Sequence, residues 1–326
     1  MDKLDEKNFR PSEFQVGLIG MGLMGRSIAT CLLAAGHPLV AIILDMAEEE
    51  EIRKGLYAHL KQLREEKITL KDPNELMEHL TLSVDFNLLS RCDLILESIT
   101  ENVESKKAVF KKIESVVSDK IIIGSNTSAI PISLLQEGAK HPERFIGIHW
   151  GEPAHITRFM EIICGDQTDI TCGHFIKAIA SYWNKEPSLL LKDIRGFITN
   201  RIFYAMLREA LHLVESGVCG YEDVDRSLRN DYGSWISLTG LFRFIDLTGL
   251  PAYLTVMEDL NKELCNRSDA PKLMKDLVAS GAKGTSNQQG FYSYTPESAQ
   301  MWDKKFMEFN YDIRKLVGRY LHEKDV

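Results

Sequence analysis

The stretch that most constrains the fold of this 326-residue chain is residues 16–29, VGLIGMGLMGRSIA. A short apolar run leads into three glycines spaced G-x-G-x-x-G, and a helical pattern follows. Gly20 permits a tight turn from strand to helix, Gly22 lets a pyrophosphate approach the backbone, and Gly25 lets the helix pack against the strand. The pattern predicts a dinucleotide-binding turn made of Gly20, Met21, Gly22, Leu23, Met24 and Gly25.

A second apolar run, residues 38–44, ends at Asp45, at the spacing from the glycines where a ribose-binding acid is expected. An acid at this place accepts hydrogen bonds from the ribose hydroxyls and repels a 2′-phosphate. The site is therefore predicted to bind NAD in preference to NADP, with Asp45 as a cofactor contact. The glycine pattern alone leaves an ordinary glycine turn as the alternative.

Apolar runs alternate with helical patterns as far as residue 192. This alternation predicts an α/β domain of the Rossmann type, a doubly wound and mostly parallel sheet with helices on both faces. We place it at residues 1–194, with a mobile tail over residues 1–13 and a helical insertion over residues 47–79. Helical periodicity dominates from residue 195 onward, so residues 195–326 are predicted to form an all-helical domain.

The net charge of −8, without a long basic run, argues against nucleic acid or an anionic membrane surface as a partner. The most apolar long segment, residues 236–257, is interrupted by Arg243, Asp246 and Pro251, which favours a buried helix pair over a membrane span. The six cysteines form no C-x-x-C pair, and residues 1–13 are mainly polar and charged. We therefore expect reduced thiols, no signal peptide and a cytoplasmic location.

The best candidate for chemistry is His149, which follows an apolar strand at the end where parallel strands present ligand-binding groups. Glu161 lies further along the chain, inside the next apolar run. A carboxylate there is costly unless it has a partner, and a histidine is a suitable one. The pair predicts a general base and the acid that orients it. A core histidine bonded to the backbone is the alternative.

Two further polar residues stand at the ends of predicted elements. Ser128 follows a strand and is suited either to bind substrate or to cap a helix. Asn200 lies near the start of the first helix of the second domain, where the same two roles are open. The spacing of His141, His149 and His155 matches no metal-binding motif, so no metal is expected.

Taken together, these residues resemble the 3-hydroxyacyl-CoA dehydrogenase family, including relatives that oxidise free hydroxy acids such as gulonate and carnitine. The resemblance extends from residue 14 to about residue 294 and includes GMGLMG, ENVESK, SNTS, His149 with Glu161, and GFITNR, in that order. It implies that His149 and Glu161 are catalytic and that Ser128 and Asn200 contact substrate. It also implies a homodimer formed through the helical domain, a role in fatty acid metabolism, and NAD contacts by the glycines, Asp45, Glu101 and Lys106.

The chain departs from the family pattern at three places. The family commonly has H-F-x-N-P after the catalytic strand, whereas residues 149–153 read HWGEP, so Glu152 replaces an Asn. The Ser and Lys with which acyl-CoA enzymes hold CoA have no clean match near residues 55–67. Arg243, in a segment resembling G-P-F-E, suits either a substrate carboxylate or an ordinary ion pair. These departures leave the choice between acyl-CoA and free acid open.

The resulting hypothesis is an NAD-dependent dehydrogenase that oxidises a 3-hydroxy group, in the manner of 3-hydroxyacyl-CoA dehydrogenases. The first alternative is a dehydrogenase of a free 3-hydroxy acid, of gulonate, carnitine or β-hydroxyacid type. The β-hydroxyacid family resembles the opening VGLIGMGLMG, but its G-x-S-G-G stretch is not found. The second alternative is a non-catalytic NAD-binding protein with a structural or sensory role.

Overall fold

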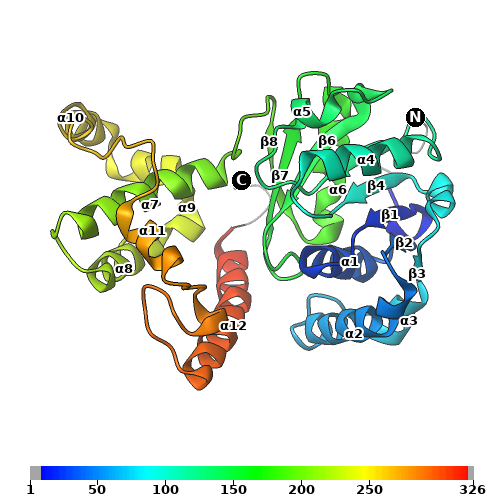
Figure 1. The fold of residues 1–326 in the computed structure, drawn as a ribbon, viewed down its shortest axis with the longest axis horizontal. Coiled ribbons are helices and arrows are strands. Elements are labelled where there is room, and N and C mark those ends of the chain that lie inside the picture. Colours follow the sequence, from blue (N-terminus) through cyan, green and yellow to red (C-terminus); the bar gives the residue numbers. More distant parts are fainter. Residues whose placement is uncertain (1–8, 322–326) are drawn as a thin grey trace. The chain divides into compact units, whose positions relative to one another are not determined.

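The computed structural model describes residues 9–321 and contains two compact units, which divide between Ile198 and Thr199 (Figure 1). The sequence-based boundary lay at residues 194/195. Residues 195–198 fall in the first unit, where Phe197 is buried and the Ile198 amide donates to the Glu161 carboxylate. Each unit is considered by itself below.

Among residues 9–198, the structure forms one eight-stranded sheet with the order β3-β2-β1-β4-β5-β6-β7-β8. Every neighbouring pair is parallel except β6 and β7, which are antiparallel. The chain moves outward from β1 to β3 and then returns to place β4 on the other side of β1. In sheets of this type, ligands bind at the carboxyl ends of the strands where the strand order reverses, which here lies between β1 and β4. The strands are β1 (Val16–Ile19), β2 (Leu39–Ile42), β3 (Leu80–Ser83), β4 (Leu94–Glu97), β5 (Ile122–Ser125), β6 (Phe145–Trp150), β7 (Phe159–Cys164) and β8 (Glu186–Leu190).

Helices cover both faces of this sheet, as the sequence pattern predicts (Figure 1). Successive strand residues point to opposite faces, so the central strand β4 sends Leu94 and Leu96 into one core and Ile95 into the other. The first core is shared with α1, α2 and α6, and the second with α4 and α5. The helices of this unit are α1 (Leu23–Ala35), α2 (Glu49–Glu65), α3 (Pro73–Glu78), α4 (Val103–Glu114), α5 (Ile132–Gln136) and α6 (Ile170–Ile179).

The insertion expected over residues 47–79 consists of α2 and α3. Four apolar residues of α2 at helical spacing (Ile52, Leu56, Leu60 and Leu63) are buried, and three of them join the first core. Four successive acids, residues 48–51, lie at the start of the helix, where its dipole stabilises negative charge. Asp72 caps α3 by accepting a hydrogen bond from the Asn74 amide.

The mobile tail expected over residues 1–13 is wrong for residues 9–13; residues 1–8 lie outside the described part of the chain. Phe9 is buried, and its ring lies 5.0 Å from that of Phe14 and 5.1 Å from that of Tyr182. Residues 11–13 form a short 3-10 helix. The polar composition of this segment concealed one aromatic residue whose burial is enough to order it.

The second unit is helical throughout. Its helices are α7 (Thr199–Glu215), α8 (Tyr221–Asn230), α9 (Tyr232–Thr248), α10 (Leu250–Leu260), α11 (Lys272–Ala279) and α12 (Pro296–Tyr320). Helix α9 is interrupted at Gly240, which has φ 63° and ψ −173°. Helix α12 lies within the range predicted to be helical, and it begins with a capping box between Thr295 and Ser298.

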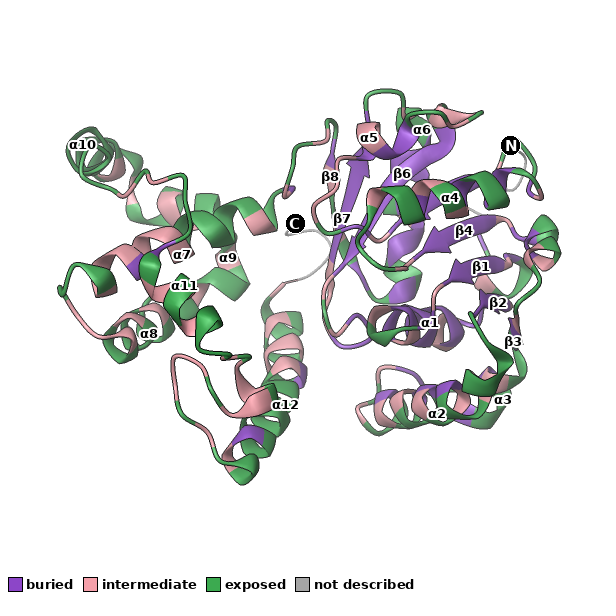
Figure 2. Ribbon diagram, in the orientation of Figure 1, coloured by how far each residue is buried: buried purple, intermediate pink, exposed green. Residues whose placement is uncertain are grey.

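The apolar segment 236–257 does form a pair of helices, α9 and α10, but the prediction that they are buried is wrong for this chain. Phe242 is 82% exposed and Leu254 is 61% exposed. Exposed residues recur along both helices (Figure 2). The side chains of residues 199–321 leave this apolar surface uncovered. Among the described residues, no helix is both long enough and apolar enough to cross a membrane.

Candidate active site

The glycine turn after β1 has the geometry that its spacing predicts. Gly20 has φ 93°, and a side chain there would place its Cβ 2.5 Å from the Ser98 carbonyl oxygen. A Cβ on Gly25 would lie 2.0 Å from the Gly20 carbonyl oxygen, so only glycine permits this approach of helix to turn. A Cβ on Gly22, by contrast, would meet no atom within 4 Å. The turn therefore leaves open space at the residue where a phosphate has to approach the backbone.

Helix α1 begins directly in this turn. Its N-cap is Gly22, which has no side chain to satisfy the first amides, and Leu23 and Met24 form the first turn. Leu23 is 70% exposed, whereas Met21 is buried. Uncapped amides and the positive end of the helix dipole favour an anion at this place.

Asp45 lies shortly beyond the end of β2, on the same edge of the sheet. It caps the short helical turn at residues 46–48, where its carboxylate accepts a hydrogen bond from the Ala47 amide at 2.9 Å. Asp45 is exposed, so its second oxygen is accessible to a ligand. This placement suits the ribose contact that the sequence predicts.

His149 and Glu161 are direct partners across the antiparallel pair β6–β7. His149 Nδ1 lies 2.9 Å from Glu161 Oε2, and the other carboxylate oxygen accepts the Ile198 amide at 3.0 Å. The Glu161 side chain is 1% exposed and that of His149 is 10% exposed. Because an ionised carboxylate only accepts hydrogen bonds, Nδ1 carries the proton and Nε2 of the neutral ring is left to accept one.

Two aromatic rings lie beside His149, and one amide side chain holds the backbone of the next residue; none of the three was singled out from the sequence. Phe159 and Phe197 lie 5.4 Å and 5.6 Å from the imidazole, centroid to centroid. Asn126 accepts a hydrogen bond from the Trp150 amide at 3.0 Å and donates to Ser98 Oγ at 3.1 Å. Asn126 thus ties the ends of β4, β5 and β6 together. Its place in the SNTS stretch was the available signal.

Glu101 and Ser128 meet at the carboxyl ends of β4 and β5. One Glu101 oxygen accepts hydrogen bonds from Thr127 Oγ1 at 2.6 Å, the Ser128 amide at 2.9 Å and the Ala129 amide at 3.2 Å. Burial opposes ionisation of Glu101, but the bond from Thr127, the charge of Lys106 and the two amides outweigh it and lower the pKa of this carboxyl. Ser128 itself is exposed at the tip of the loop.

Lys106, in the first turns of α4, is fully buried. Its Nζ lies 2.7 Å from Glu97 Oε1 and 3.5 Å from Glu101 Oε2. Glu97 was missed by sequence reasoning, although it is a carboxylate at the end of an apolar strand, the same signal that singled out Glu161. The structure thus joins Lys106 to Glu101 and to an unforeseen second carboxylate.

The remaining predicted residues lie in the second unit or in an exposed loop of the first. Asn200 is the second residue of α7, and Arg243 is exposed in α9; both belong to the second unit. Glu152 is exposed in the β6–β7 connection. Among the described residues, no group of three or more His, Cys, Asp or Glu side chains is arranged to hold a metal ion.

Comparison with known proteins decides the family. Residues 15–194 match the NAD binding domain of 3-hydroxyacyl-CoA dehydrogenase, and residues 196–294 match its C-terminal domain. The chain belongs to the 3-hydroxyacyl-CoA dehydrogenase family. The predicted family, Rossmann-type fold, NAD cofactor and oxidoreductase class are thereby confirmed.

Members of this family with different substrates resemble the chain to different degrees. A 5-formyl-3-hydroxy-2-methylpyridine 4-carboxylate 5-dehydrogenase of Mesorhizobium japonicum is 32% identical over 87% of this chain and 92% of its own length. A crystal structure of an enzyme of that name, described as an NAD+ dependent dismutase, covers 93% of this chain and 98% of its own with a TM-score of 0.87 and 30% identity. The (S)-3-hydroxybutyryl-CoA dehydrogenase of Ralstonia eutropha covers 86% and 99%, with a TM-score of 0.72 and 29% identity.

Proposed function

We propose that this member of the 3-hydroxyacyl-CoA dehydrogenase family oxidises a hydroxyl group with His149 as general base. The observation that carries the proposal is the 2.9 Å contact between His149 Nδ1 and the buried Glu161 carboxylate. That contact fixes the tautomer in which Nε2 is free to take a proton. It also supplies a negative charge beside the imidazolium that results.

The reaction divides into one proton and one hydride. Nε2 of His149 removes the hydroxyl proton as the carbon–oxygen double bond forms, and Glu161 stabilises the positive ring. NAD, when bound, takes the hydride from the same carbon. Ser128 and Asn200 are proposed to hold the substrate oxygen, as their family counterparts do. The low exposure of His149 and Glu161 strengthens their mutual interaction, because little water screens it.

The residues of the N-terminal unit fit NAD. The open space at Gly22, the uncapped start of α1 and the accessible Asp45 carboxylate lie along one edge of the sheet. We assign the pyrophosphate to residues 20–25 and the adenosine ribose to Asp45. Glu101 is the proposed neighbour of the nicotinamide end, because it lies in the β4–α4 loop beside the switch point.

The substrate proposed first is a 3-hydroxyacyl-CoA, after which the family is named. A second candidate, a small free acid, is favoured by one observation. The solved structure of the pyridine-carboxylate enzyme matches this chain with a TM-score of 0.87, whereas that of the hydroxybutyryl-CoA enzyme matches it with a TM-score of 0.72.

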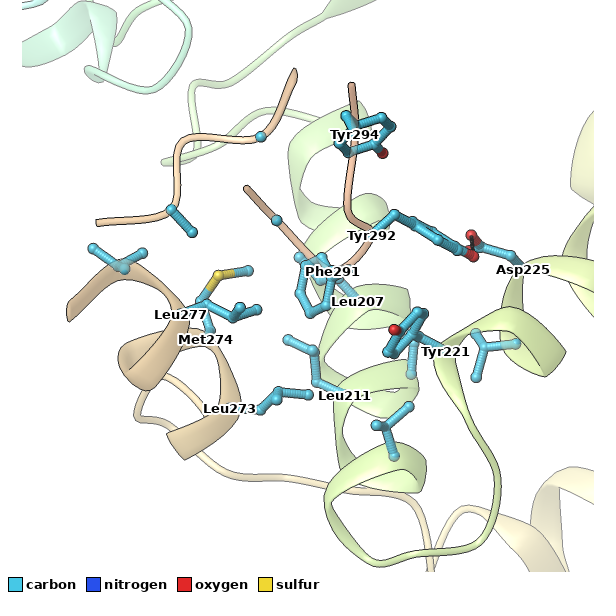
Figure 3. A pocket seen from close by; sticks show the side chains of 17 residues that line it. Leu207, Leu211, Tyr221, Asp225, Leu273, Met274, Leu277, Phe291, Tyr292 and Tyr294 are labelled. Carbon is cyan, nitrogen blue, oxygen red and sulfur yellow. Dashed lines mark hydrogen bonds between the residues drawn. The ribbon is translucent and has the colours of Figure 1, made fainter. Parts of the chain in front are cut away.

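We also propose that the second unit forms a homodimer. Among residues 199–321, the buried apolar side chains are Leu211, Pro271, Ala299 and Tyr311. A cavity of about 350 Å³ opens between α7, α8, α11 and the loop at residues 282–294 (Figure 3). Its walls are apolar apart from a few groups such as Asp225, whose carboxylate accepts a 2.7 Å bond from Tyr292. Apolar walls that face solvent favour filling by apolar side chains, such as those of a second copy.

The location proposed is the cytoplasm. Each of the six cysteines is free, and four of them are buried. Thiols in this state are typical of a reducing compartment.

The test is NADH formation, measured by absorbance, with L-3-hydroxyacyl-CoAs and with free hydroxy acids, including carnitine, gulonate, 3-hydroxybutyrate and a hydroxymethylpyridine carboxylate. The His149→Gln protein is the control. Turnover of the thioesters supports the first substrate class, and turnover of free acids alone supports the second. Tight NADH binding without turnover of either class would contradict the proposal and leave the non-catalytic alternative.

A further inference from the structure

The strongest unexplained feature of the N-terminal unit is a buried charge cluster behind the β4 and β5 loops. Glu97, the last residue of β4, is 0% exposed. Its Oε2 accepts a hydrogen bond from Ser125 Oγ at 2.6 Å, and its Oε1 accepts the Ile99 amide at 2.7 Å and Lys106 Nζ at 2.7 Å. A carboxylate buried this deeply is tolerated because every bond it accepts comes from a well-placed donor.

Lys106 links this carboxylate to the loop above it. Its side chain is 1% exposed, and its Nζ lies between Glu97 at 2.7 Å, Glu101 at 3.5 Å and the Ile99 carbonyl oxygen at 3.5 Å. The ammonium group is therefore enclosed by protein acceptors. Any effect of Lys106 on a ligand has to pass through Glu101, whose side chain is 41% exposed.

Glu101 in turn orders the loop that carries Ser128. One of its oxygens accepts hydrogen bonds from Thr127 Oγ1 and from the amides of Ser128 and Ala129, while the other faces Lys106. The charge pattern alternates along the cluster: carboxylate, ammonium, carboxylate. Removal of one inner charge leaves the other without its partner in a buried place, which is strongly unfavourable.

We propose that Glu97 and Lys106 are positioning residues, which hold Glu101 and, through it, the Ser128 loop at the reacting end of the cofactor site. This inference rests on the proposed function for the role of the loop. Without Glu97, Lys106 has Glu101 as its remaining anionic partner and draws that carboxylate away from Thr127 and the two loop amides. Without both charges, Glu101 keeps its three bonds to the loop.

The test compares Glu97→Gln, Lys106→Met and the double variant Glu97→Gln/Lys106→Met in the full chain. For Glu97→Gln we expect the KM of the substrate to rise about tenfold and kcat to fall at least about tenfold, with the Kd of NADH within about threefold of the wild type. The double variant is expected to regain about tenfold in kcat/KM over Glu97→Gln, because the Lys106 charge that pulls Glu101 away from the loop is gone. The matched control is Lys107→Met/Glu137→Gln, which removes a 2.9 Å ion pair between the next residue of α4 and the end of α5.

A second measurement keeps the test independent of turnover. Hydrogen exchange of the amides at residues 126–130 is expected to speed up in Glu97→Gln, to return toward wild type in the double variant, and to stay unchanged in the control. Faster exchange with rescue, in a protein that oxidises none of the substrates, would support the positioning role and refute the proposed function. Lack of rescue in both measurements, or a loss of NADH affinity in Lys106→Met that the double variant retains, would overturn the positioning role. The positioning role would also be overturned if Glu97→Gln and Lys106→Met lowered the melting temperature but left kcat, KM and the hydrogen exchange of the loop unchanged.

Discussion

The two units of this chain differ in how far their apolar side chains are buried. In the N-terminal unit, strand and helix side chains fill two cores, one on each face of the sheet, and residues such as Leu18, Leu32 and Ile148 are fully buried. In the C-terminal unit, helices α9, α10 and α12 expose large apolar side chains, among them Phe242, Leu254 and Phe309 (Figure 2).

The difference shows that two segments with similar helical periodicity can differ in how far they bury their own apolar side chains. The first unit contains what a folded domain requires to bury its apolar residues: a sheet and two covering layers of helices. The second unit has regular helices, but the surface onto which their apolar faces would pack is missing from residues 199–321. A continuous exposed apolar surface of this kind marks a protein interface. We expect assembly to depend on the second unit and proton transfer to depend on His149 of the first, and four predictions test that division.

The largest effect is expected at the base itself. Replacement of His149 by Gln should lower kcat by about 10²- to 10⁴-fold, about 3–5 kcal/mol in the barrier, because no other group takes the hydroxyl proton. NADH affinity, measured by fluorescence titration, should stay within about threefold. A variant with kcat within a few-fold of wild type would show that the chemistry lies elsewhere, for instance on a lysine of the second unit.

The next effect concerns assembly. Leu254→Asp on α10 places a carboxylate on the exposed apolar surface and should weaken the dimer at least about 100-fold, about 3 kcal/mol, because the charge would be buried without a partner. Analytical ultracentrifugation over a range of concentrations measures the change. Leu70→Asp, at an 84% exposed position of the first unit, is the control and should leave the dimer intact. Equal dissociation constants for the two variants would remove the assembly role from this surface.

Acid sensitivity should belong to the N-terminal unit. Burial, with the charges of His59 and Lys185, lowers the pKa of His155 to about 3, and burial lowers the pKa of His37 to about 4 despite its bond to the Phe14 carbonyl. Burial also lowers the pKa of His59, whose ring stacks on that of His155 at 4.2 Å. The pKa of a histidine in the unfolded chain is 6.5, so below this pH the unfolded chain binds protons that the folded chain does not bind. The free energy of unfolding therefore falls as the pH falls from 6.5 toward 3.

Between pH 7 and pH 5, His155 and His37 should each lower the free energy of unfolding by about 2 kcal/mol. Urea unfolding at several pH values measures the slope, and His155→Asn should flatten it whatever its effect at neutral pH. His174→Asn on α6 removes an exposed histidine and should leave the slope as it is. A slope that does not change in His155→Asn would contradict the assignment.

The smallest effect concerns the choice of cofactor. Asp45→Asn should shift the ratio of NADP to NAD affinity by about tenfold, about 1.4 kcal/mol, because the charge that repels a 2′-phosphate is lost. Asp85→Asn is the control, since Asp85 is also an exposed acid that caps a helical turn after a strand. Identical ratios in the two variants would separate Asp45 from the ribose site.

The sequence by itself determined the elements with strong local signals. The G-x-G-x-x-G turn, the alternation of strands and helices, and the pairing of His149 with Glu161 follow from residue types and their spacing. A glycine at a tight turn predicts a positive φ, and a carboxylate inside an apolar strand predicts a polar partner, so both can be inferred from the sequence. Glu101 and Lys106, also singled out from the sequence, face each other in the structure as His149 and Glu161 do.

Only the tertiary structure decided how those pairs are supported. Phe159 and Phe197 lie beside His149, and Asn126 holds the Trp150 amide next to it. Glu97 reaches Lys106 through the packing of α4 against β4. Phe9 is ordered in part by the ring of Tyr182, from the other end of the unit's sequence, which local polarity could not predict. Helices α9 and α10 are helical because of local propensity, but whether they are buried depends on which surfaces meet them, and a single chain does not contain that information.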